Sequence, residues 1–172
     1  MGEIPIFFGV YKNIRSTRGG FLNIEECAKQ IRALGNGHIP VDPWVIAQRL
    51  RIEVLDERSP SVLFSESGRA YIVVDERKDE FHRHIDCAHE IGHYVLHEGN
   101  QMLFPKLWTD YQETQAWAFA LYLLVPTEEI ESMIVPGIGR QQCIVEVSQH
   151  FRVPLSFASK RLQIFEHLIL RH

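Results

Sequence analysis

Hydrophobic residues recur at helical spacing in several parts of the chain, and residues that typically begin or end a helix bound each of these parts. From Asn23 to Gly35, an N-capping asparagine, a glutamate three positions later and a closing glycine predict one helix. Asp42 and Pro43 predict the start of a second helix that continues to Leu50. The same signals predict further helices at 79–97 with Gly99 as the stop, at 109–125, from 127 onward, at 141–150 and at 155–170.

Three short runs rich in β-favouring residues lie between the second and third predicted helices, at 52–55, 61–65 and 70–74. A turn signal at 66–68 separates the last two runs. Because consecutive short strands usually pair with one another, these runs predict a small, mostly antiparallel meander. The expected fold class is therefore α+β, with this sheet packed against the helix at 79–97 and the helix that follows it.

The length of 172 residues favours a single domain, since a domain takes roughly 150 residues. Residues 1–20 follow neither the helical nor the strand period, so we expect them to form an N-terminal arm or extension. The domain itself is then expected at 21–172, and within it 138–172 would form a helical tail with helix-turn-helix proportions.

The charge balance and the cysteine pattern exclude several broad classes of protein. The net charge is −4, whereas a protein that binds nucleic acid or an anionic membrane over its whole surface needs a positive field. No apolar run approaches the ~20 residues that cross a bilayer, so no membrane partner is expected. The three cysteines are far apart and form no CxxC pair, which favours a reducing, cytoplasmic location.

Histidine is concentrated in one window, since five of the nine histidines lie between His82 and His97. Within this window, residues 89–93 form an HExxH motif on a predicted helix. Residues four apart on a helix lie one turn above each other, so His89 and His93 can offer imidazole nitrogens to one metal ion. Glu90 is rotated by about 100° from His89, which is the position of a general base. This pattern predicts a Zn²⁺ site with Glu90 as the catalytic base.

A catalytic zinc site takes three protein ligands, so a third ligand has to be found. Glu113 is the better candidate, because it opens the next predicted helix and the small residues Ala116 and Ala120 on its stripe permit the two helices to approach closely. The alternative role for Glu113 is a solvated charge favoured by the helix dipole. His97 is a rival ligand, but about 12 Å of helix separates it from His89. We therefore interpret His97 as a helix C-terminal or substrate-cleft residue.

Three blocks of sequence, in this order, resemble the ImmA/IrrE family of zinc metallopeptidases. They are IPVDPWVIAQRLRIEV at 39–54, YIVVDERKDEFHRHIDCAHEIGHYVLH at 71–97 and ETQAWAFALYLLVP at 113–126, with a weaker match at 145–162. The resemblance implies a zincin-like fold of the gluzincin type, with His89, His93 and Glu113 as zinc ligands and Glu90 as the base. It also implies a bacterial regulatory protease that cuts a helix-turn-helix repressor, often encoded beside it, and so relieves repression.

Two residues depart from the pattern of that family. Trp117 stands where the family commonly has Asn or Asp, four residues after the ligand glutamate. Asp86 stands where the family commonly has Thr, three residues before the first histidine. Because a partner that orients a metal ligand raises metal affinity, these departures bear on affinity, catalytic rate and the subgroup to which the chain belongs.

The leading hypothesis is hydrolysis of a peptide bond, with Glu90 moving a proton from the attacking water to the leaving amine. Such a reaction also needs a donor that stabilises the oxyanion. The candidates for this role, or for other substrate contacts, are Tyr94, His97, Tyr111 and Tyr122. An extended substrate is expected to pair with the predicted strand just before the HExxH helix, which comprises Tyr71, Ile72, Val73 and Val74.

Two other functions remain as alternatives. HExxH also occurs by chance, and the tail at 138–172 has helix-turn-helix proportions and more basic than acidic residues, which is typical of DNA binding. Its last helix is more apolar than a helix that reads a DNA groove, so direct nucleic-acid binding is not expected. The second alternative is a partner-binding regulatory protein whose zinc is structural or vestigial. Glu90 argues against it, because a structural site needs no base beside its first ligand.

Overall fold

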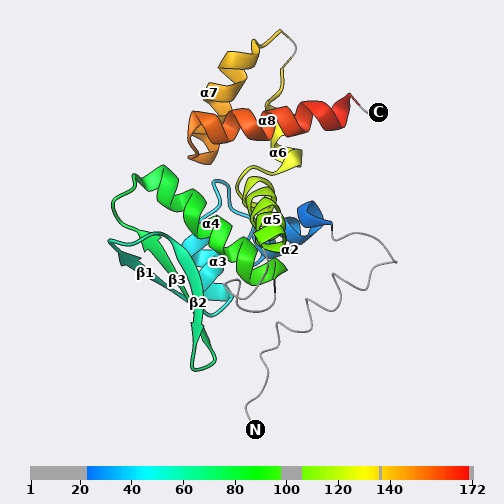
Figure 1. Ribbon diagram of the computed structural model, residues 1–172. Coiled ribbons are helices and arrows are strands. Elements are labelled where there is room, and N and C mark those ends of the chain that lie inside the picture. The colour runs from blue at the N-terminus through cyan, green and yellow to red at the C-terminus, as the bar shows by residue number, and fades with distance from the viewer. Residues whose placement is uncertain (1–22, 98–105, 136, 171–172) are drawn as a thin grey trace.

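In a computed structural model of the chain, residues 23–97, 106–135 and 137–170 are described, and they form seven helices and one three-stranded sheet (Figure 1). The elements in chain order are α2 (Ile24–Ala33), α3 (Pro43–Arg49), β1 (Ile52–Glu57), β2 (Val62–Glu66), β3 (Arg69–Asp75), α4 (Glu80–Leu96), α5 (Lys106–Leu124), α6 (Thr127–Met133), α7 (Arg140–Phe151) and α8 (Leu155–Ile169). The α+β class is thereby confirmed. The predicted arm at 1–20 and the predicted helix stop at Gly99 lie outside the described residues.

Local capping signals account for where three of the helices begin. The side chains of Asn23, Asp42 and Asp79 each accept a hydrogen bond from a backbone N–H in the first turn of their helix, at 3.1, 2.9 and 3.0 Å. The helices predicted from these residues are confirmed as α2, α3 and α4. By contrast, α5 already includes Lys106, so it starts before the predicted position at 109 and Glu113 is not in its first turn.

The sheet has the order β1-β3-β2, with β1 parallel and β2 antiparallel to β3. The predicted mostly antiparallel meander is therefore wrong, although each strand was placed correctly. Ser67 and Gly68 have φ values of 51° and 78°, which suits the tight hairpin between β2 and β3. β1 then pairs with the far edge of β3 instead of with its sequence neighbour, so β2 and β1 are the two edges.

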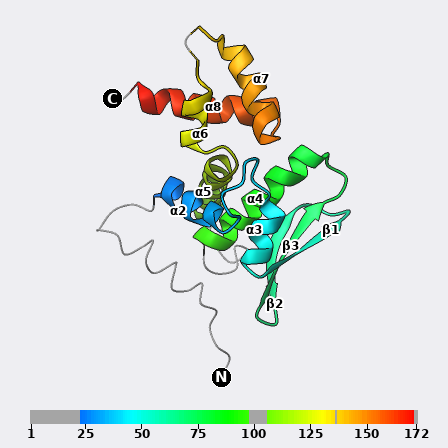
Figure 2. The same cartoon turned by 180° about the vertical axis from the view of Figure 1, so that it is seen from behind.

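Helices cover one face of this sheet and form a second layer behind it (Figures 1 and 2). α3 and α4 contact the strands, while α5 packs against α4 and α2. Ile52, Ile72 and Val74 alternate along β1 and β3 and are at most 4% exposed, as expected for the face that the helices cover. The HExxH helix is thus held between the sheet and α5.

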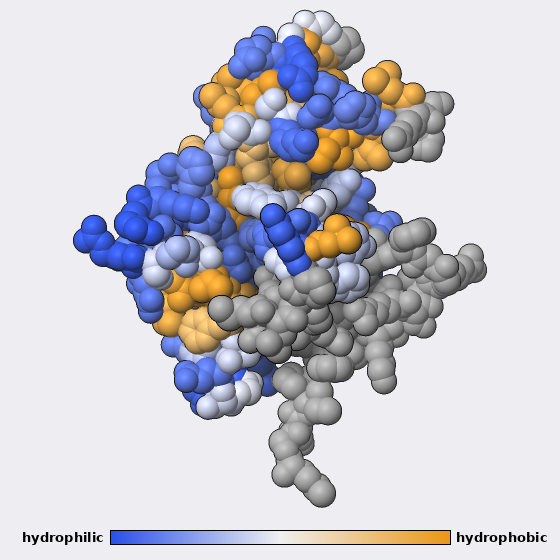
Figure 3. Space-filling view, in the orientation of Figure 1, coloured by the Kyte–Doolittle hydropathy of each residue, from blue (hydrophilic) through white to orange (hydrophobic). Residues whose placement is uncertain are grey.

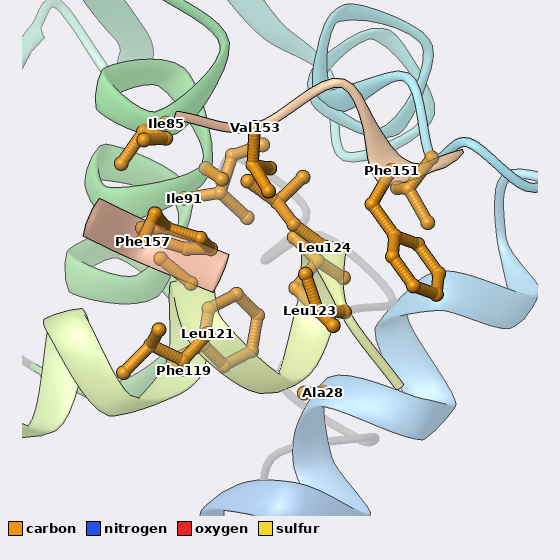
Figure 4. Close-up of a cluster of buried hydrophobic side chains, with 14 of the residues drawn as sticks. Ala28, Ile85, Ile91, Phe119, Leu121, Leu123, Leu124, Phe151, Val153 and Phe157 are labelled. Atoms are coloured by element: carbon orange, nitrogen blue, oxygen red, sulfur yellow. The ribbon is translucent and has the colours of Figure 1, made fainter. Parts of the chain in front are cut away.

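The C-terminal helices share the hydrophobic core of the rest of the chain. Phe151, Val153 and Phe157, around the turn between α7 and α8, lie against side chains of α4 and α5 (Figure 4). The buried Arg161 of α8 donates to the Val125 carbonyl at 2.9 Å, just after α5 ends. Its guanidinium also donates to the Thr127 hydroxyl at 2.6 Å. These contacts fasten α8 to the end of the helix that carries Glu113.

Candidate metal centre

His89 and His93, one turn apart on α4, and Glu113 of α5 bring three ligand atoms together. The two Nε2 atoms are 3.0 Å apart, and each lies 3.2 Å from a different carboxylate oxygen of Glu113. The histidine side chains are 10% and 5% exposed, whereas that of Glu113 is 42% exposed. The triad therefore has a buried side on α4 and an open side at Glu113, by which a substrate can approach.

The spacing and the protonation of the triad fit a tetrahedral metal ion. Ligands about 2.1 Å from zinc in a tetrahedron lie about 3.4 Å from one another, close to the observed separations. Burial is the main reason why the pKa of His89 is lowered to about 4 and the pKa of His93 to about 3. Both imidazoles are then neutral near pH 7 and keep a lone pair for a metal. Among the described residues, this is the one cluster of three or more His, Cys, Asp or Glu side chains with such geometry.

The two ligand helices meet where neither has a bulky side chain. A Cβ atom placed on Gly92 would lie 3.0 Å from the Ala116 carbonyl oxygen and 3.1 Å from both the Ala116 Cα and the Phe119 ring. Ala116 and Ala120 are fully buried, in line with the close helix approach expected from these small residues. The glycine inside the HExxH motif thus sets the distance between α4 and α5, a role that motif spacing does not reveal.

Substituting Gly92 with alanine is expected to destabilise the fold by about 1–2 kcal/mol, because the overpacking against the α5 backbone outweighs the higher helix propensity of alanine. It should also displace Glu113 and weaken metal binding. Urea unfolding and zinc competition with a chromogenic chelator would measure both effects. Gly35→Ala is the matched control, since its Cβ would meet atoms no closer than 3.4 Å. Wild-type stability and zinc affinity in Gly92→Ala would contradict this account of the helix contact.

Glu90 faces the sheet and contacts its edge strand. Its Oε2 accepts a hydrogen bond of 2.8 Å from the backbone N–H of Leu63 in β2. Burial raises the pKa of Glu90 to about 7, and this bond works in the opposite direction. A carboxyl group with a pKa near the ambient pH can both accept and return a proton, which suits a general base.

Trp117 lies one turn beyond Glu113 on α5 and packs on the first histidine. The ring centroids of Trp117 and His89 are 4.5 Å apart. The buried Nδ1 of His89 has no hydrogen-bond partner among the described residues. A metal-ligating histidine usually donates this second N–H to a carboxylate or carbonyl. In this chain, the Trp117 ring supports His89 by packing in place of such a bond.

The four residues predicted as oxyanion or substrate contacts lie at different distances from the triad. His97 is the C-cap of α4; its ring is 5.4 Å from that of His93, and its Nε2 lies 3.0 Å from the Gln112 carbonyl. Tyr111 is half exposed at the start of α5, and its hydroxyl accepts from Gln115. The ring of His97 thus lies against that of His93, one of the three candidate metal ligands.

The other two tyrosines of this group lie against the core. Tyr94 is partly buried and packs on the hydrophobic core. Tyr122 lies nine residues after Glu113, about 13 Å further along the helix, and the Arg161 guanidinium covers its ring at 4.6 Å. Tyr122 therefore lies outside the metal centre, and its contact with a substrate stays a prediction.

The strand predicted to pair with a substrate is already paired on both edges. Tyr71, Ile72, Val73 and Val74 belong to β3, which lies between β1 and β2 and is in register with both. Pairing of a substrate with this strand is therefore ruled out. The edge strand next to Glu90 is β2. The sequence predicted this strand, but it did not show that the strand lies at an edge of the sheet.

Comparison with known proteins shows the family to which this chain belongs. The model of a peptidase family, described as the IrrE N-terminal-like domain, matches residues 47–163. The uncharacterized protein YqaB of Bacillus subtilis (strain 168) is 33% identical over 127 residues, which cover 74% of this chain and 73% of that protein. The phage-like element PBSX protein XkdA of the same strain is 34% identical over 126 residues, which cover 73% of this chain and 63% of that protein. All residues of the triad lie within the matched range.

Proposed function

Because the chain belongs to the peptidase family of the IrrE N-terminal-like domain, we propose that it is a zinc-dependent metalloendopeptidase. The observation that carries this proposal is the triangle of His89, His93 and Glu113 atoms, 3.0 to 3.2 Å apart, on the same helix as Glu90. The two imidazoles and the carboxylate would hold the ion. A bound Zn²⁺ would supply a Lewis acid that polarises the scissile carbonyl and lowers the pKa of water to about 7.

The residues around the triad have separate roles in the proposed reaction. Glu90 accepts a proton from the attacking water at its carboxylate and delivers it to the nitrogen of the leaving amine. Its burial keeps bulk water away during this transfer. The His97 ring lies 5.4 Å from that of His93, and we propose that its Nε2–H turns from the Gln112 carbonyl to donate to the substrate carbonyl oxygen as negative charge develops on it.

We propose that the substrate binds as an extended segment along the outer edge of β2, which pairs with no further strand of the described residues. Main-chain groups of an edge strand can pair with a peptide, and the side chains beside them select its sequence. Val62 and Phe64 of β2 are 48% and 38% exposed, and the Phe64 ring stacks on Tyr71 of β3 at 5.1 Å. Hydrophobic residues gather over the strands in Figure 3. This surface favours a substrate with apolar side chains near the cleaved bond.

The proposed substrate is a helix-turn-helix transcriptional repressor, whose cleavage relieves repression. This proposal rests on the resemblance to the ImmA/IrrE family, and the similarity to a protein named for a phage-like element is in keeping with it. The cytoplasm is the proposed location, where such a repressor acts. No helix of the described residues has the length and apolarity to cross a membrane.

Cleavage of a repressor by the purified protein tests this function. We expect the zinc-loaded protein to cut a purified helix-turn-helix repressor from the same genome at a defined bond, identified by mass spectrometry of the fragments. Phenanthroline should stop the cleavage, and added Zn²⁺ should restore it. An intact repressor after incubation with fully zinc-loaded protein would contradict the proposed substrate, and cleavage that persists in phenanthroline would contradict the metal mechanism.

Among residues 137–170 of the tail, which the structure describes, two of the four basic side chains are engaged within the fold. Arg161 is fully buried, and Arg140 pairs with Glu166 at 3.0 Å. Since phosphate binding needs exposed positive charge, these contacts favour an interior role for α8 over a groove-reading one.

A further inference from the structure

A chain of hydrogen bonds joins the start of β2, the end of β3 and the middle of α4. The Ser61 hydroxyl donates to the carboxylate of Asp86, and the same hydroxyl oxygen accepts from the backbone N–H of Asp75 at 3.1 Å. The ammonium of Lys78 lies 2.7 Å from the same Asp86 oxygen. Ser61 thus links the end of β3, through the Asp75 N–H, to the Asp86 carboxylate of α4.

Asp86 is well placed to transmit this contact to the proposed base. Its side chain is only 12% exposed and lies one helical turn before Glu90 on α4. Ser61 lies two residues before Leu63, whose backbone N–H donates to Glu90. The edge strand is therefore fastened to α4 at two successive points, first by Asp86 and then by Glu90.

The second of these bonds depends on where the strand lies. Leu63 donates its N–H to Glu90, so this N–H takes no part in the pairing of Leu63 with Ile72 of β3. The N-terminal end of an edge strand is free to move unless a side chain holds it. The ammonium of Lys78 pairs with the mostly buried side chain of Asp86 and adds a second contact at the same oxygen.

We propose that Asp86 is a positioning residue for the peptidase reaction: through Ser61 it holds β2 so that the Leu63 N–H orients the Glu90 carboxylate. This inference rests on the proposed function, because it assigns to Glu90 the role of base. It gives a physical role to one of the two residues at which the chain departs from the family pattern. In this arrangement, the strand β2, which would receive the substrate, and the proposed base Glu90 belong to one rigid unit.

The Leu63 amide offers a direct readout by NMR of the ¹⁵N-labelled full-length protein, with and without Zn²⁺. In Asp86→Ala and in Ser61→Ala, we expect hydrogen exchange of this amide to accelerate by at least about tenfold. Its proton resonance should move upfield, because an N–H that loses a carboxylate acceptor is less deshielded. Ser61→Thr keeps the hydroxyl and should restore both values. Zinc stoichiometry should not change, since neither residue touches the triad.

Two controls separate positioning from general stability. Glu53→Gln, on the opposite edge strand β1, should leave the Leu63 amide unchanged. In Asp86→Ala, the amides of β1 and of the β1–β3 ladder should keep their wild-type exchange rates. An unchanged Leu63 amide, or faster exchange throughout the sheet, would overturn the proposal. Because this readout needs neither metal nor cleavage, a failure of the proposed peptidase function would be visible separately.

Discussion

Replacing Glu90 with glutamine is expected to lower the rate of peptide hydrolysis by about 10²–10⁴-fold. Glutamine has nearly the shape of glutamate but cannot accept a proton from the attacking water. Its side-chain oxygen can still accept the bond from the Leu63 N–H, so the edge strand should stay in place. The triad is untouched, and zinc should remain bound in a 1:1 ratio.

The rate of cleavage of the repressor and the zinc content of the same sample would measure this effect. Glu131→Gln makes the same chemical change at an exposed position of α6 and should leave the rate unaltered. Full activity in zinc-loaded Glu90→Gln would show that Glu90 is not the base. Such a result, combined with normal biological activity, would favour the alternative of a partner-binding protein with a structural metal.

Replacing Glu113 with alanine should reduce zinc affinity by more than about 100-fold, since loss of even an indirect partner of a ligand costs 10- to 100-fold. The two histidines on α4 would remain, but two ligands are fewer than zinc sites in proteins use. Elemental analysis of untagged protein after dialysis, followed by zinc titration against a competing chelator, would give the occupancy and the affinity.

Glu131→Ala is the matched control for this variant, because Glu131 is an exposed carboxylate of α6. It should bind zinc as the wild type does. Zinc content that is equal in wild type and Glu113→Ala would remove Glu113 from the ligand set and would require a different third ligand.

Features that depend on a few neighbouring residues could be predicted from the sequence. The caps at Asn23 and Asp42 are set by side chains that bond to the first turn of their own helix, so the pattern alone located α2 and α3. The spacing of His89 and His93 likewise has a local geometric meaning on any helix. Their position on one face of α4 followed directly from it.

Features that depend on contacts between distant segments could not be predicted in this way. The order β1-β3-β2 is decided by which strand edges are covered in three dimensions, so the predicted meander and the predicted substrate strand both failed. Glu113 is not at the head of its helix, because α5 begins at Lys106, three residues before the predicted start. Asp86 stood out as unusual in sequence, but nothing in the sequence pointed to Ser61 as its partner.

The packing of the tail has a consequence for how the protein unfolds. Phe151, Val153 and Phe157 fill the same core as the metal-binding helices, and Arg161 ties α8 to the last carbonyl after α5. Separating α7 and α8 from the rest would expose this apolar surface to water and leave a buried guanidinium without its acceptors. The tail and the helices that carry the triad thus form one cooperative unit. A mutation that weakens the packing of the tail is therefore expected to destabilise the C-terminal end of α5, the helix that carries Glu113.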